Sequence, residues 1–69
     1  PGAPPPPPDV VLGVDYGQVR VGLALGHADS GLVLGLPVLH HPGDDEGLAL
    51  KLAEIARARD ATVVVLGHP

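Results

Sequence analysis

The stretch that decides the fold is residues 10–25, VVLGVDYGQVRVGLAL, in which two aliphatic runs flank a short polar segment. Asp15 ends the first run, and a tight turn at Gly17 and Gln18 follows it. Such a turn predicts an antiparallel hairpin in which Asp15 lies opposite Arg20. The hairpin therefore puts an acidic side chain at the rim of a sheet, where it can take part in chemistry.

The alternation of side chains along the hairpin predicts one bulky face and one nearly bare face. The bulky face carries aliphatic side chains, namely Leu12, Val14, Val21 and Leu23. The bare face carries Asp15 together with Val11, Gly13, Gly22 and Ala24. Small residues beneath a carboxylate either let a helix pack close to the sheet or leave space for a metal ion and a phosphate backbone. The pattern leaves both uses open.

Asp15 has two interpretations, and they are compatible. Directly opposed charges in a hairpin often form a cross-strand pair worth roughly 0.2 to 1 kcal/mol, so a pair with Arg20 is the structural interpretation. A carboxylate at a partly apolar strand end is costly unless it has a charged partner or a metal ion, so a metal ligand is the functional interpretation.

Length and composition limit the fold to one domain. The chain has 69 residues and no cysteine, which excludes a disulfide or a cysteine-ligated zinc. A chain of this size buries only about 60% of its unfolded surface, so we expect the front part of a longer protein. Residues 1–9 are proline-rich and are expected to form a disordered tail, which leaves residues 10–69 as the folded part.

The charge of the chain bears on its partners. The net charge is −4, with four lysine and arginine residues, which argues against binding nucleic acid through bulk positive charge. It does not argue against a nuclease that meets phosphate through divalent cations. No apolar run reaches the roughly 18 residues that span a bilayer, so we expect no membrane association and a cytoplasmic location.

Beyond the hairpin the sequence predicts a third strand and a helix. The strand covers residues 32–39 and contains Pro37, whose missing backbone donor favours the edge of a sheet. The helix is expected to begin at Asp44 or Asp45, whose charge suits its first turn, and to end near Arg59. Its apolar stripe, which is typical of a surface that packs on a sheet, consists of Leu48, Leu52, Ile55 and Ala56.

A fourth strand follows the helix over residues 62–66. This continuous β-branched and aliphatic run is typical of a strand buried on both faces, and the helical crossover favours parallel pairing. The adjacent His40 and His41 do not predict a zinc site, because neighbouring strand residues point to opposite faces and a third ligand is missing.

Residues 15–24, DYGQVRVGLA, resemble the D-Y-G-x-x-R-x-G-x-A motif that opens the YqgF/RuvX family. Residues 29–37 and 63–69 are similar to later segments of the same family, so the resemblance covers nearly everything after Asp9. Members are known as Holliday-junction resolvases and as nucleases that process the precursor of small-subunit ribosomal RNA. Val19 replaces the basic residue usual before the arginine, and His68 replaces a leucine.

The resemblance implies an α/β, ribonuclease H-like fold. Its first part is a three-stranded antiparallel meander, one helix and a fourth strand parallel to the first. Residues 10–69 would then be the N-terminal part of a nuclease domain. The unpaired edge of such a sheet also favours self-association, so a homodimer is a further expectation.

The resemblance further implies a metal-dependent endonuclease that cleaves phosphodiesters in an RNA precursor or in junction DNA. Asp15 would be the catalytic residue and the ligand of a two-metal Mg²⁺ or Mn²⁺ site. Gly17 and Arg20 would contact the nucleic acid. The remaining acidic ligands of the family lie beyond Pro69, so the 69-residue chain alone is expected to be inactive.

Two other classes remain as alternatives. One is a non-catalytic scaffold of the same fold that binds RNA or a protein. The other is an ATP-binding fragment like those of actin and the sugar kinases, in which an Asp-x-Gly turn also opens the first phosphate loop. Cleavage assays and stabilisation by ATP distinguish these classes from a nuclease.

Overall fold

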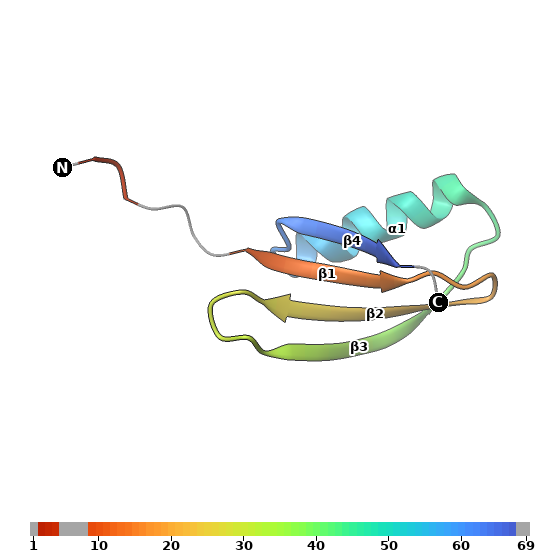
Figure 1. Cartoon of the computed structure of the whole chain (residues 1–69). Helices are drawn as coiled ribbons and strands as arrows, with labels where there is room; N and C mark the ends of the chain where they lie inside the picture. Colours follow the sequence, from red (N-terminus) through yellow and green to blue (C-terminus); the bar gives the residue numbers. More distant parts are fainter. Residues whose placement is uncertain (1, 5–8, 68–69) are drawn as a thin grey trace.

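The computed structural model describes residues 2–4 and 9–67, which form a four-stranded sheet covered on one side by a helix (Figure 1). Its elements are β1 (Val10–Asp15), β2 (Arg20–His27), β3 (Val33–His40), α1 (Asp45–Ala58) and β4 (Val63–Gly67). The strand order is β3-β2-β1-β4, with β4 parallel to β1 and the other neighbours antiparallel. This is the ribonuclease H-like order that was expected. The predicted disordered tail falls largely on residues outside those described.

The predicted register of the first hairpin is wrong by two residues. Asp15 lies opposite Gly22 instead of Arg20, and a loop over residues 16–19 replaces the two-residue turn. The backbone groups that would close the shorter turn are engaged elsewhere. The Tyr16 N–H donates to the carbonyl of Gly67 at 3.3 Å, and the carbonyl of Val19 accepts from another segment of the chain.

The two faces of the hairpin are nevertheless as predicted, because a shift by an even number of residues leaves every side chain on its face. The bulky face forms the core, whose buried members are Leu12, Val14, Val21, Leu23, Leu25 and Leu48. The helix lies over this face, and the rest of its predicted apolar stripe packs against the core as the half-buried side chains Leu52, Ile55 and Ala56. Each buried leucine or valine contributes roughly 1.5 to 3 kcal/mol.

The helix begins one residue after Asp44. Asp44 occupies the N-cap position, but its side chain makes no cap hydrogen bond, and its carbonyl accepts from the Leu48 N–H at 3.1 Å. Asp45 and Glu46 lie in the first turn, where their charge suits the positive end of the helix dipole.

The helix ends in a left-handed turn at Asp60, whose φ is 57°. The Ala61 N–H donates to the Ala56 carbonyl at 2.8 Å, and the Asp60 N–H donates to the Arg57 carbonyl at 3.3 Å. This pair of bonds is a Schellman motif, in which glycine is the usual residue at the left-handed position.

The prediction for one edge strand is confirmed and the prediction for the other is wrong. Strand β3 lies at one edge of the sheet as Pro37 predicted, and the pairing with β2 is irregular around this proline, between the pairs Val21–Leu39 and Leu23–Leu36.

The predicted burial of the fourth strand on both faces is wrong. Val63 is 36% exposed and Leu66 is 62% exposed. Among the described residues β4 pairs with β1 alone and forms the other edge, and none of its side chains belongs to the core cluster. The aliphatic composition of β4 therefore indicates a preference for apolar neighbours. The described residues do not provide such neighbours.

Candidate functional site

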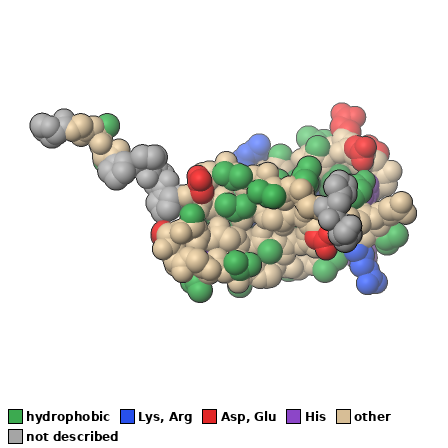
Figure 2. Space-filling model, viewed as in Figure 1, with side chains coloured by type: hydrophobic (Ala, Val, Ile, Leu, Met, Phe, Trp, Pro, Cys, Tyr) green, Lys and Arg blue, Asp and Glu red, His purple; other side chains and the backbone are tan. Residues whose placement is uncertain are grey.

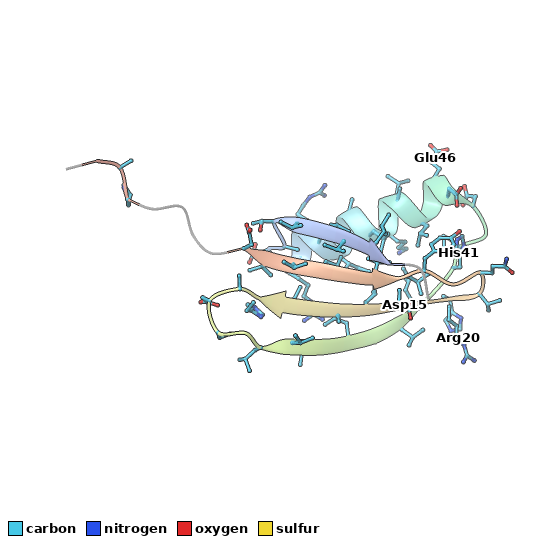
Figure 3. The ribbon with its side chains drawn as sticks, in the orientation of Figure 1. Asp15, Arg20, His41 and Glu46 are labelled. Carbon is cyan, nitrogen blue, oxygen red and sulfur yellow. The ribbon has the colours of Figure 1, made fainter. Side chains whose placement is uncertain are left out.

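Asp15 is the last residue of β1 and lies on the face of the sheet that α1 does not cover (Figure 3). Its carboxylate is exposed, and its neighbours across the sheet are Gly22 of β2 and Gly67 of β4. A Cβ at Gly22 would lie 3.9 Å from Oδ2 of Asp15. Backbone therefore flanks the carboxylate on both sides, which leaves it accessible to a ligand.

The face around Asp15 is hollowed. An open depression of about 580 Å³ crosses three strands, and its lining combines Asp15 and Val65 with the small residues Gly13, Gly22, Ala24 and Gly67. Figure 2 shows this side of the molecule as a largely tan surface, the colour of backbone and of other side chains, with separate apolar patches. Because α1 packs on the opposite face, the small residues serve as open space in the part of the chain that the structure describes, and not as a helix-packing surface.

Arg20 begins β2, on the same face and at the same end of the sheet as Asp15 (Figure 3). Its neighbour across the sheet is His40 of β3. The predicted cross-strand ion pair with Asp15 is wrong, because the register puts Gly22 opposite Asp15. Within residues 2–4 and 9–67 the ion pair that forms joins Lys51 and Glu54 at 3.8 Å, on the helix surface. The guanidinium of Arg20 is thus exposed and free of Asp15.

Gly17 lies in the loop that follows Asp15. A Cβ at this position would collide with the carbonyl oxygen of Arg20, so the path of the loop requires glycine. The structure gives Gly17 this steric role; contact with a nucleic acid stays a prediction.

The helix side of the same loop carries contacts that the sequence analysis missed. The Tyr16 hydroxyl lies 3.2 Å from Nε2 of His41 and 3.4 Å from Oδ1 of Asp45. The two rings meet edge to face, with their centroids 5.5 Å apart. A histidine just before a helix start was the available signal, but its contact with Tyr16 bridges 25 positions and needs the topology.

The metal-binding capacity of the described residues is limited. No group of three or more histidine, cysteine, aspartate or glutamate side chains among them is placed to hold a metal ion. The carboxylate of Asp15 offers the hard oxygen atoms that suit Mg²⁺ or Mn²⁺, and by itself it would supply only one part of such a site. No helix in the described ranges is long and apolar enough to cross a membrane.

Comparison with known proteins points to one family. The model of the family described as "RuvX: Holliday junction resolvase" matches residues 9–69. A protein of Chlamydia felis named "Putative pre-16S rRNA nuclease" is 44% identical over 62 residues, which cover 87% of this chain and 40% of the relative. A protein of Kineococcus radiotolerans with the same name is 46% identical over 65 residues, which cover 90% of this chain and 33% of the relative. The chain thus spans well under half the length of these relatives. No solved structure matches.

Proposed function

Because the chain belongs to the RuvX family of Holliday junction resolvases, we propose that it is part of a metal-dependent endonuclease with Asp15 as a metal ligand. The observation that carries this proposal is the exposed carboxylate of Asp15 at the open end of β1, flanked by Gly22 and Gly67. An acid that served only to fix the hairpin would have its charged partner opposite it, and Asp15 has none among the described residues.

The residues of the site have distinct tasks in this proposal. Bound Mg²⁺ or Mn²⁺ ions would activate water for attack on phosphorus and stabilise the leaving oxygen. Asp15 supplies a ligand oxygen. Arg20 holds a phosphate oxygen of the nucleic acid, for which the fork of a guanidinium is well suited. The small residues of the open face let the nucleic acid backbone come close to the carboxylate.

The substrate that we propose is an RNA precursor, with junction DNA as the competing substrate. The names of the two relatives favour RNA, whereas the description of the family names the junction. The exposed Arg20 guanidinium suits the phosphates of either one. A cytoplasmic location is part of the same proposal.

We also propose that residues 1–69 alone do not cleave nucleic acid. A two-metal site needs several acidic ligands, and Asp15 is the carboxylate that the described residues bring to the ends of β1 and β4 on the open face. Robust cleavage by the 69-residue chain would disprove this part of the proposal.

The decisive experiment uses the full-length protein. Cleavage of single-stranded RNA and of four-way junction DNA is measured with Mg²⁺ and with Mn²⁺, for the wild type, Asp15→Asn and a matched control, Asp29→Asn, in an exposed turn. We expect metal-dependent cleavage that Asp15→Asn abolishes and Asp29→Asn retains. Equal cleavage by all three proteins would remove Asp15 from the mechanism. No cleavage by the wild type would favour a non-catalytic scaffold, and thermal stabilisation by ATP would favour the ATP-binding class.

A further inference from the structure

His41, which follows the end of β3, holds the loop after Asp15 at two points. Its backbone N–H donates to the carbonyl of Val19 at 2.8 Å, and its ring, labelled in Figure 3, meets the ring of Tyr16 edge to face. We call the group formed by Tyr16, Val19, His41, Gly43 and Asp45 the His41 clamp. It joins the end of β1 to the segment between β3 and α1.

The hydrogen bonds of the clamp form a chain with one direction. The Gly43 N–H donates to Nδ1 of His41 at 3.0 Å, so Nδ1 is an acceptor and the ring proton of a neutral imidazole lies on Nε2. Nε2 then donates to the Tyr16 hydroxyl at 3.2 Å. The Tyr16 hydroxyl in turn donates to Oδ1 of Asp45 at 3.4 Å. Each member has a defined role, which fixes both the ring and the phenol.

The clamp bears directly on Asp15. Tyr16 is the next residue, and its side chain lies on the helix side while that of Asp15 lies on the open face. The Tyr16 N–H also donates to the Gly67 carbonyl, at 3.3 Å. The carboxylate of Asp15 has no hydrogen bond of its own within the described residues, so its place depends on the backbone at the end of β1. The ends of strands fray readily, and the His41 clamp opposes fraying at the end of β1.

We infer that Tyr16 and His41 are positioning residues, which hold the end of β1 so that the Asp15 carboxylate is preset to bind a divalent metal ion. This inference rests on the proposed function, since it assigns a metal ion to Asp15. Residues that orient a metal ligand typically change metal affinity or activity by about 10- to 100-fold when they are replaced. The exposed setting and the indirect contact place the expected effect near the lower end of that range.

The histidine offers a matched pair of variants. In His41→Gln the side-chain amide nitrogen reaches the position of Nε2 and still donates to Tyr16. In His41→Asn the amide oxygen takes the position of Nδ1 and still accepts from Gly43, but the donor to Tyr16 is lost. Tyr16→Phe keeps the ring and removes the hydroxyl. His27→Asn, at the other end of β2, is the control.

The experiment measures, on the full-length protein, the Mn²⁺ dissociation constant, kcat and KM for an RNA substrate, and the melting temperature. For Tyr16→Phe and His41→Asn we expect Mn²⁺ binding and kcat to fall about tenfold, with KM for RNA changed less than about twofold. His41→Gln restores both quantities to within about threefold of the wild type, and His27→Asn leaves them unchanged.

Three other results would overturn the inference. If Tyr16→Phe and His41→Asn melt earlier but bind Mn²⁺ and turn over like the wild type well below their melting temperatures, the clamp is a structural tie only. If His41→Asn recovers function and His41→Gln does not, the Gly43 turn matters and the contact with Tyr16 does not. A wild type that binds Mn²⁺ without cleaving refutes the proposed nuclease, and the Mn²⁺ constants alone then decide the inference. A wild type that does not bind Mn²⁺ refutes both.

Discussion

Asp15 and Gly22 lie directly opposite each other in neighbouring strands, and a Cβ at Gly22 would stand 3.4 Å from the Cβ of Asp15. Because glycine has no side chain, the side of the Asp15 carboxylate that faces β2 is open; we call it the free side. A side chain there would occupy the depression through which, under the proposed function, a metal ion and a phosphate approach Asp15. The relationship ties the composition of β2 to the chemistry proposed for β1.

The first prediction concerns this free side. Gly22→Val should weaken Mn²⁺ binding and cleavage by the full-length protein about tenfold or more, because the branched side chain fills the approach to Asp15. Gly26→Val is the control: it lies in the same strand on the same face, and a Cβ there meets only the Val11 carbonyl, at 3.9 Å. Equal losses in both variants would mean that the strand, and not the site, is sensitive.

The second prediction concerns the core. Leu12 is fully buried in β1, so Leu12→Ala should lower the free energy of unfolding by about 2 to 5 kcal/mol. Leu50 on the helix is 67% exposed, and Leu50→Ala should stay within about 0.5 kcal/mol of the wild type. Urea titration of the full-length protein measures both. A large effect at Leu50 would indicate that a further part of the protein covers the helix.

The sequence predicts the two faces of the sheet and the order of its elements because both depend on local periodicity and on the handedness of a crossover. Side chains alternate strictly along a strand, so even a register wrong by two residues kept Asp15 with Gly13 and Gly22 on the open face. The parallel placement of β4 beside β1 needed the family resemblance as well.

The features that the sequence did not predict depend on contacts between segments far apart in the chain. The loop over residues 16–19 takes its path from hydrogen bonds to Gly67 and His41, which turn chemistry alone does not reveal. The exposure of β4 depends on what lies beyond its outer edge, whereas its composition reports only a preference for apolar surroundings. The Tyr16–His41 contact likewise requires the fold before it can be seen.

The third prediction concerns the loop after Asp15. Gly17→Ala introduces a collision with the Arg20 carbonyl oxygen, so the loop must move and stability should fall by about 1 to 3 kcal/mol. Gln18→Ala changes the neighbouring exposed position and should have little effect on stability. Thermal melts of the two variants provide the comparison. An unchanged melting temperature for Gly17→Ala would show that the loop has a second path.

The fourth prediction concerns the end of the helix. Asp60 has a left-handed backbone and a negative charge beside the negative end of the helix dipole, so Asp60→Gly should stabilise the protein by about 0.5 to 1 kcal/mol. Asp60→Asn removes the charge and keeps a side chain that tolerates this conformation, which separates the two causes. If both variants gain equally, the charge is responsible; a loss in Asp60→Gly would contradict the prediction.

The fifth prediction concerns Arg20, whose exposed guanidinium shares a face with Asp15. If it holds a phosphate of the substrate, Arg20→Ala raises KM for RNA several-fold and lowers the salt dependence of binding by about one unit in the logarithmic slope, because one fewer counterion is released. Arg57→Ala, in the last turn of α1, removes the same charge elsewhere and should leave both quantities unchanged.

Arg20→Lys tests geometry, since a lysine keeps the charge without the fork of donors. A lysine that restores the salt slope but not KM indicates a two-pronged contact with one phosphate. Equal behaviour of Arg20→Ala and Arg57→Ala would instead reduce Arg20 to a general contributor to surface charge.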